Sequence, residues 1–243
     1  MINMERKDKL TISIMVVAAI GILAIVWGTF LGGPNLADGN KTVLVLAADK
    51  DEQPGGGVDM AFMVELRDGN IKKYTPVYPG GMRHPSQPAP GNLPGTMFLH
   101  DSLWNNENGQ GMEYAKEIVA ANTGMEADAV VVVYNEGLDA VIDSIRPFKV
   151  DGVVSDLDST SIIRENDAYS GYPGSGSANG TMSRGDAVMV LVRALSEAAV
   201  DPTKRNTMVQ TALDQYSKGN ILMIPEGSFV GLMATKGFEN LLG

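Results

Sequence analysis

Two aspartates have the sequence surroundings best suited to a chemical role in this chain. Asp49 ends a continuous apolar run at 43–48, and Asp59 follows a glycine-rich turn at 54–57. If both flank buried strands, their carboxylates lie at neighbouring strand ends, where open α/β sheets usually bind ligands. Two carboxylates there could hold Mg²⁺, which proteins bind through one or two carboxylates plus substrate phosphates. The simpler alternative is that Asp49 caps a turn and Asp59 bonds to backbone N–H groups of the glycine loop.

Arginines are the second group of candidates. Arg205 falls in the first turn of a helix predicted to begin near Pro202, where a cation opposes the helix dipole. It therefore needs an anionic partner, which could be a carboxylate of the domain or a substrate phosphate. Arg193 has a plainer explanation, since Asp186 and Glu197 share its predicted helix face and could pair with it.

Two largely apolar runs and a hairpin turn predict three strands in the first part of the chain. They cover 43–48, 60–66 and 71–77, with Asp68-Gly69 as a hairpin turn between the last two. The first run is apolar throughout, which is typical of a strand buried on both faces.

The stretch 78–108 is rich in Pro, Gly and Asn and is predicted to be an irregular loop and a candidate lid. It contains Arg83, His84 and His100. The two histidines are too far apart for a metal-site signature, so we expect polar loop residues.

Further along, regular structure is predicted to resume. The expected elements are a helix ending at Gly124, a strand at 128–134, a helix capped by Asn135, a strand at 148–150, an irregular stretch at 155–181, and two final helices. This order predicts one α/β domain, with a single mixed β-sheet flanked by helices.

An uncharged apolar segment precedes this domain. It predicts a cytoplasmic leader at 1–9, a transmembrane helix at 10–31, a linker at 32–41 and an extracytoplasmic domain at 42–243. The basic leader predicts a single-pass protein of the cell membrane with its N-terminus in the cytoplasm. A cleaved signal peptide is the rival interpretation, but the apolar run exceeds the usual length of such segments.

Composition limits the classes of partner. The chain has no cysteine, so a disulfide framework is excluded. Its formal net charge is −10, and the leader contributes +1, so the rest of the chain carries −11. So acidic a domain predicts no nucleic-acid partner.

The two aspartates also carry a resemblance to a family. Ala47-Ala48-Asp49 matches the Gly-Ser-Asp that ends the first strand of LytR-CpsA-Psr envelope proteins, and Gly57-Val58-Asp59 matches their Arg-Ser-Asp. Ser183 to Arg193 resembles the family's arginine-ended helix, and Lys204-Arg205-Asn206 its Arg-Gln helix start. Nearly all of 43–220 resembles this family, and most closely a related domain of unknown function from bacteria and archaea.

The resemblance implies a pocket for a polyprenyl pyrophosphate-linked glycan. Asp49 and Asp59 would hold Mg²⁺, Arg83, Arg193 and Arg205 would bind the substrate, and Asp59 and Arg205 would be catalytic. The protein would then be a glycopolymer phosphotransferase of the cell envelope. The arginine beside the second aspartate is missing, which keeps open a non-catalytic envelope protein that binds or supports structure with the same fold. In either case we expect Asp49, Asp59 and Arg205 to converge beneath the 78–108 loop.

Overall fold

The computed structural model describes residues 36, 38–52, 54–77, 80–104, 109–166, 168 and 182–228. The predicted leader, the predicted span at 10–31 and half of the linker, residues 32–35 and 37, lie outside these ranges. Among the helices within them, none has both the length and the apolar character needed to cross a membrane.

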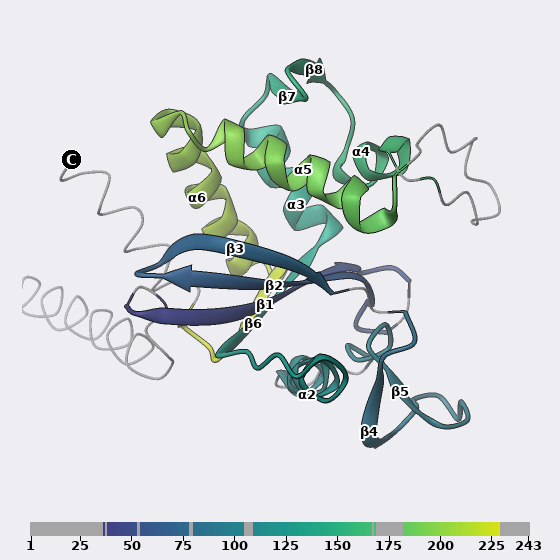
Figure 1. Cartoon of the computed structure of the whole chain (residues 1–243). Coiled ribbons are helices and arrows are strands. Elements are labelled where there is room, and N and C mark those ends of the chain that lie inside the picture. The colour runs from purple at the N-terminus through teal and green to yellow at the C-terminus, as the bar shows by residue number, and fades with distance from the viewer. Residues whose placement is uncertain are drawn as a thin grey trace, which may run out of the picture.

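Strands and helices alternate irregularly along the described chain (Figure 1). The strands are β1 Asn40–Asp49, β2 Gly57–Arg67, β3 Asn70–Val77, β4 Arg83–Pro88, β5 Thr96–Phe98, β6 Ala129–Tyr134, β7 Phe148–Val150, β8 Val153–Ser155 and β9 Ile221–Ile224. The helices are α2 Gln110–Thr123, α3 Asn135–Ser144, α4 Ser159–Asn166, α5 Arg184–Ala198 and α6 Pro202–Ser217.

Five strands form the central sheet, in the order β3-β2-β1-β6-β9. β1 pairs in parallel with β6, whereas the other three pairings are antiparallel. The predicted single mixed sheet flanked by helices is therefore confirmed.

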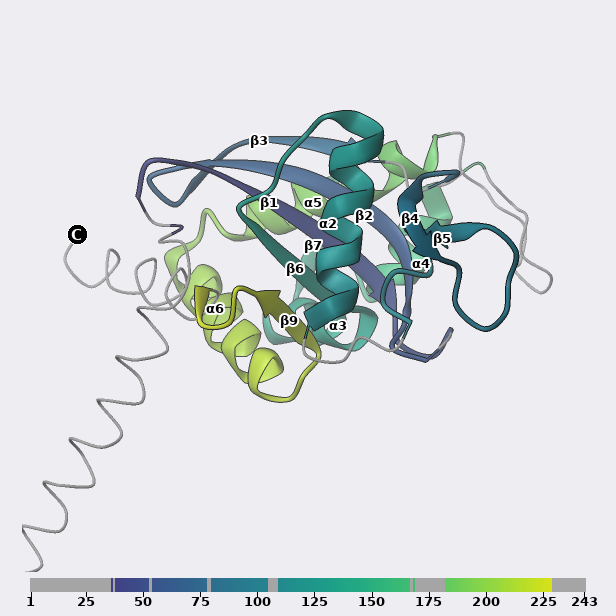
Figure 2. The same ribbon diagram turned by 90° about the horizontal axis from the view of Figure 1, so that it is seen from below.

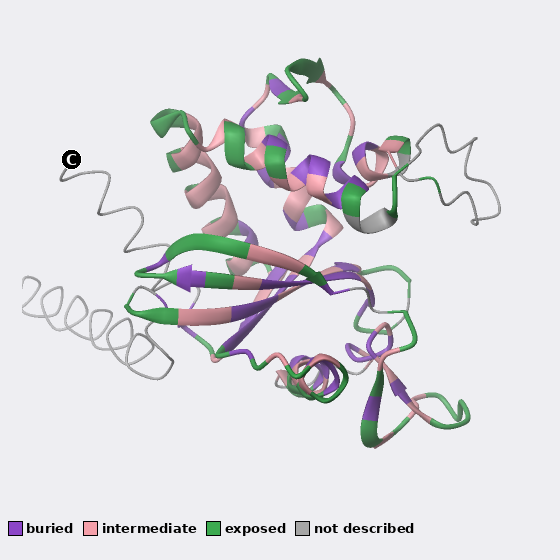
Figure 3. Ribbon diagram, in the orientation of Figure 1, coloured by how far each residue is buried: buried purple, intermediate pink, exposed green. Residues whose placement is uncertain are grey.

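Helices cover both faces of this sheet (Figure 1, and from below in Figure 2). Leu44 and Leu46 of β1 pack with α2 on one face. Val43 packs on the opposite face, in a cluster that α6 helps to close, and Val45 lies against both that cluster and residues of α5. The central strands are consequently buried on both sides, as the apolar run at 43–48 predicts (Figure 3).

Local turn chemistry accounts for two of the predicted boundaries. Asp68 and Gly69 both have positive φ, at 50° and 68°, which is the geometry of the tight hairpin turn expected between β2 and β3. Gly124 has φ 72° and its N–H donates to Ala120 O at 2.9 Å, so it caps α2 in the left-handed conformation.

Other elements differ from the sequence prediction. The stretch 78–108 is not uniformly irregular, because β4 and β5 form a two-stranded ribbon within it. The stretch 155–181 contains α4, and β9 adds a fifth strand that was not predicted. The predicted strand at 148–150 exists but pairs with β8 outside the central sheet. Asn135 begins α3 rather than capping it, and Tyr134, at the cap position, makes no side-chain hydrogen bond to the first turn of the helix.

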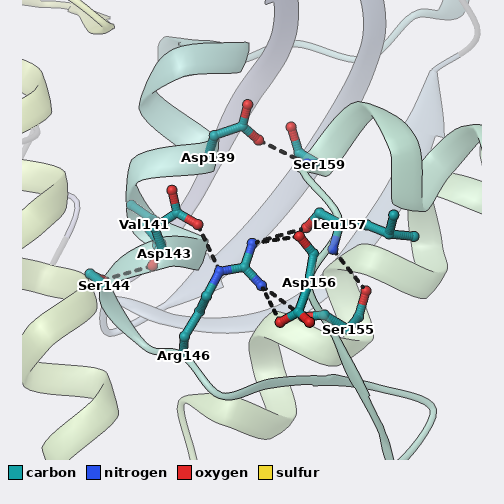
Figure 4. A network of polar contacts seen from close by, with 9 residues as sticks. All are labelled: Asp139, Val141, Asp143, Ser144, Arg146, Ser155, Asp156, Leu157 and Ser159. Carbon is teal, nitrogen blue, oxygen red and sulfur yellow. Dashed lines mark hydrogen bonds and ion pairs between the residues drawn. The ribbon is translucent and has the colours of Figure 1, made fainter.

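Arg146 secures the chain that leads from α3 to α4 (Figure 4). Its guanidinium donates to Asp143 Oδ1 at 2.8 Å, to Ser155 O at 2.7 Å, and to Asp156 O and Leu157 O at 3.2 Å. A planar group with five donors can hold four acceptors in fixed directions. The side chain therefore ties the end of α3 to the chain that leaves β8.

We expect replacement of a core leucine to reveal how much the two-sided burial of β1 contributes. Leu46→Ala removes a side chain with 0% exposure, so the free energy of unfolding should fall by about 2–5 kcal/mol in urea denaturation followed by circular dichroism. Ile71→Ala, on the edge strand with 62% exposure, is the control and should change it by about 0.5 kcal/mol or less. Equal losses would contradict the assignment of the core.

Arg146→Lys tests the guanidinium as a connector. A single ammonium cannot reach all of the acceptors, so we expect a loss of about 1–3 kcal/mol in the same denaturation experiment. Arg193→Lys is the matched control, because Arg193 is exposed and donates from Nε to Met189 O of its own helix, at 3.2 Å. A loss at Arg193 as large as that at Arg146 would refute the role given to the network.

Candidate functional site

The candidate site lies at the edge of the sheet where the parallel strands β1 and β6 both end. Their register pairs Ala48 with Tyr134, so the segments that follow the two strands leave the sheet side by side. The glycine-rich connection from β1 to β2 begins at this edge, and the β4–β5 ribbon lies beside it (Figures 1 and 2). This is the edge at which open α/β sheets bind ligands.

A β-bulge sets the direction of Asp59. Ala47 and Ala48 are consecutive on β1 but face Met60 and Val58, so Asp59 is the additional residue on β2. The bulge also exchanges faces: Val58 packs on the α2 side, whereas Met60 packs on the opposite side. The carboxylate of Asp59 therefore leaves the alternation that its neighbours follow.

Asp59 lies together with Glu52 and His100. Each of the three offers one ligand atom, and these atoms all lie within 4.8 Å of one another. The closest approach of His100 Nε2 to Glu52 Oε1 is 3.9 Å. Asp59 and His100 are half-buried and Glu52 is exposed, so solvent reaches the cluster. Two carboxylates and one imidazole form a donor set for a divalent cation.

The position of His100 is fixed by β2. Its Nδ1 lies 3.1 Å from Val58 O, and its own carbonyl accepts the Val58 N–H at 3.0 Å. A carbonyl can only accept, so Nδ1 carries the proton in this bond and Nε2 is the ligand atom in the neutral ring. The imidazole is thus oriented before any ligand arrives.

Gly57 leaves the room that the cluster needs. A Cβ at this position would lie 2.5 Å from Glu52 Oε2 and 2.8 Å from His100 Cε1. Any larger residue would displace one of the two side chains. Absence of a side chain at Gly57 is therefore a condition for their approach.

Tyr134 contacts the β1–β2 connection at Gly55 and Gly56. Its hydroxyl donates to Gly55 O at 2.8 Å, and a Cβ on Gly56 would meet the tyrosine ring at 2.8 Å. Lys50 Nζ lies 5.5 Å from the centre of the same ring and donates to Asn220 Oδ1 at 3.1 Å. These contacts fix the loop to the end of β6.

The sequence candidates are distributed differently from the expectation. Asp49 Oδ1 accepts the Asp51 N–H at 3.0 Å, which is the turn-capping role that was the structural alternative for this residue. Asp59 is grouped with Glu52 and His100. The expected Mg²⁺ pair of Asp49 and Asp59 stays a prediction, and Glu52 and His100 are additional ligand candidates beside Asp59.

The three predicted arginines lie on different elements, Arg83 on β4, Arg193 on α5 and Arg205 on α6. Arg205 lies in the first turn of α6, where its neighbour Lys204 donates to Pro147 O at 2.8 Å, whereas the chain after α6 reaches the site through Asn220. Helical rise over the twelve residues that follow Arg205 separates it from the end of α6 by about 18 Å. The convergence of Arg205 with the two aspartates stays a prediction.

Arg83 and Arg193 are also occupied elsewhere. The Arg83 guanidinium stacks on the Phe98 ring, with Cζ 3.5 Å from the ring centre, and donates to Thr96 O, so it stabilises the β4–β5 ribbon. Arg193 donates to its own helix, as described above. Neither guanidinium is held toward Asp59 by these contacts.

Sequence reasoning missed Glu52 and His100. Glu52 stands in the same turn as Asp49 and could have been included with it, because the whole turn leaves the sheet at one edge. His100 belongs to the 78–108 stretch, and no local pattern reveals that this segment returns to β2. The hydrogen bonds between Val58 and His100 bring the two together.

Burial gives Tyr134 a marked pH dependence. Desolvation, and secondly the charge of Glu136, raise the pKa of the Tyr134 hydroxyl above its usual value of 10.0. Unfolded tyrosine ionises near pH 10, so Tyr134 should lower the stability progressively as pH rises from about 10 through the folded pKa, with no effect below that range. Ultraviolet titration of tyrosinate should show a late step that Tyr134→Phe removes and Tyr74→Phe, on the edge strand, retains. Persistence of the late step in Tyr134→Phe would contradict this assignment.

Comparison with known proteins agrees with this fold. Among the solved structures that resemble it is a "LytR-Csp2A-Psr enzyme from Actinomyces oris", with 14% sequence identity and a TM-score of 0.51, over 85% of this chain and 78% of that chain. Another is a Streptococcus agalactiae protein, with 13% sequence identity and a TM-score of 0.53, over 84% of this chain and 72% of that chain. The likeness confirms the LytR-CpsA-Psr fold expected from the sequence. No curated protein matches the chain. The family model "Protein of unknown function (DUF4012)" matches residues 38–169, more than half of the chain. The chain therefore belongs to the DUF4012 family.

Proposed function

We propose that this protein is a membrane-anchored, extracytoplasmic cell-envelope protein that binds a polyprenyl pyrophosphate-linked glycan at the Asp59 cluster. The observation that carries the proposal is the meeting of Glu52, Asp59 and His100 at the ligand-binding edge of this fold. The structural likeness to a LytR-Csp2A-Psr enzyme supports the assignment of this fold. The predicted span at 10–31 would hold the domain against the membrane that carries such a lipid.

Electrostatics make the binding dependent on a cation. Glu52 and Asp59 are acidic, and the ammonium of nearby Lys50 is engaged with Asn220. Carboxylates alone repel a pyrophosphate, whereas a divalent ion such as Mg²⁺ would attract it and neutralise charge on the phosphates. Glu52 and Asp59 supply oxygen ligands of the kind Mg²⁺ takes, so the residues fit that expectation.

The reaction proposed for the site is phosphotransfer. An acceptor hydroxyl would attack the glycan-linked phosphorus, forming a phosphodiester, while the phosphoanhydride bond breaks and polyprenyl phosphate leaves. The hydroxyl proton would pass to a base, and the Asp59 carboxylate at the cluster could accept it.

A second candidate function is binding without transfer. Transfer requires charge stabilisation on the departing phosphate, for which arginine guanidinium groups are well suited. Arg205 lies about 18 Å from the site end of α6, and Arg83 stacks on Phe98. This placement specifically favours a non-catalytic envelope protein that keeps the binding edge of the fold.

The proposal is tested by calorimetry on the purified full-length chain in detergent, titrated with a short-chain polyprenyl pyrophosphate in Mg²⁺ or EDTA. We expect binding in Mg²⁺ that weakens at least tenfold in EDTA and in Asp59→Asn, because both changes remove the bridge between carboxylate and phosphate. Asp51→Asn, an equal charge change in the same turn, is the control and should bind nearly as the parent does.

The product then separates the two candidates. Incubation with a pyrophosphate-linked glycan and an acceptor sugar should release polyprenyl monophosphate if the protein is a transferase, and leave the lipid pyrophosphate intact if it only binds. Absence of lipid binding by the folded parent protein in Mg²⁺ would contradict both candidate functions.

A further inference from the structure

We infer that Glu52, Asp59 and His100 form a binding site for a first-row divalent transition-metal ion such as Mn²⁺ or Zn²⁺, in preference to Mg²⁺. The three ligand atoms lie within 4.8 Å of one another, with 3.9 Å between His100 Nε2 and Glu52 Oε1. An ion with ligand bonds of about 2.1 Å places tetrahedral ligand atoms about 3.4 Å apart, so the set must contract when the ion binds. Glu52 is exposed, so its side chain can move toward the other two ligands.

Imidazole is the ligand that decides the preference. Mg²⁺ takes oxygen ligands and keeps several waters, whereas imidazole nitrogen together with carboxylate oxygen suits Mn²⁺, Fe²⁺ and Zn²⁺. A site built for Mg²⁺ would have no use for a histidine held in place. His100 therefore indicates a softer ion than the two carboxylates alone would.

The orientation of His100 is that of a metal-binding histidine. Its Nδ1 proton is directed to Val58 O at 3.1 Å, which fixes the tautomer and leaves Nε2, 3.9 Å from Glu52 Oε1, as the ligand atom. Metal-ligating histidines usually donate their second ring nitrogen to a carbonyl or carboxylate in this way. Val58 adjoins Asp59, so the same short stretch of β2 both orients one ligand and supplies another.

The surrounding backbone also makes room for the three ligands. The bulge places Asp59 outside the strand alternation, and Gly57 leaves space into which both Glu52 and His100 approach. Three ligands leave coordination positions open, as in zinc sites that keep a position for water or substrate. The two carboxylates balance the charge of a divalent ion.

Composition makes the site easy to isolate in an experiment. The chain has no cysteine and two histidines, so His84 and His100 are its only strong nitrogen or sulfur ligands for such an ion. His84 is 5% exposed, with Nδ1 accepting two backbone N–H bonds and Nε2 bonded to Glu117 at 2.7 Å. Nitrogen ligation should therefore depend on His100.

The test uses the untagged full-length chain in detergent, without glycan. Mn²⁺ is followed by the loss of its free-ion electron paramagnetic resonance signal, Zn²⁺ by competition with a chromogenic chelator, and Mg²⁺ by displacement of bound Mn²⁺. We expect one ion per chain, and Mn²⁺ and Zn²⁺ to bind at least tenfold more tightly than Mg²⁺. His100→Gln, Asp59→Asn and Gly57→Ala should each weaken Mn²⁺ at least tenfold, and Asp51→Asn should not.

Circular dichroism is the control that each variant is folded. Nitrogen hyperfine coupling to bound Mn²⁺ reports ligation by His100 independently of affinity. We expect it in the parent protein and not in His100→Gln. Mn²⁺ binding that His100→Gln leaves unchanged, or equal affinity for Mg²⁺, would overturn the inference, as would the absence of binding. The result is independent of the proposed function. Mn²⁺ binding without lipid binding would contradict only the proposal of glycan binding. Mg²⁺-dependent lipid binding that is insensitive to His100→Gln would contradict only the inference of a transition-metal site.

Discussion

The parallel pairing of β1 with β6 is the contact on which the rest of this domain depends. Both strands carry apolar side chains on both faces, so their burial requires a helical layer on each side of the sheet, with α2 on one and α3, α5 and α6 on the other. Parallel strands also end at the same edge, which brings the turn after Asp49 against Tyr134. The position of the candidate site is therefore a consequence of strand direction, and its loop cannot shift without disturbing the end of β6.

The bulge at Asp59 resolves a conflict between the core and the site. Strict alternation would place Asp59 on the face shared by Ala61 and Met63, beneath α2, where an ionised carboxylate would be strongly unfavourable. One additional residue lets Val58 occupy that face instead and leaves the carboxylate at the edge of the sheet. Core packing and ligand geometry are thus satisfied by the same local irregularity.

Sequence predicted those parts of the fold that depend on local pattern. β1, β2 and β6 follow from their apolar runs, and β3 follows from the hairpin turn at Asp68-Gly69, because burial and turn conformation act within a few residues. β4, β5, α4 and β9 are short or polar, and they form because of tertiary contacts that no window of sequence contains. The same holds for the site residues. Asp59 could be identified from the turn beside it, whereas His100 joins it through tertiary hydrogen bonds to Val58.

The arrangement of charge determines what this edge of the sheet can bind. Arg83 stacks on Phe98, Arg205 lies in the first turn of α6, and Lys50 is directed to Asn220. The cluster itself is acidic, so on its own it repels phosphate. In a site with few cationic side chains of its own, a bound cation is the main source of positive charge, and affinity for an anion must then follow occupancy by that cation. Evolution of function on this fold can accordingly proceed through the metal ligands, because replacing an oxygen ligand by an imidazole changes both the ion and its Lewis acidity while the scaffold of β1, β2 and β6 stays the same.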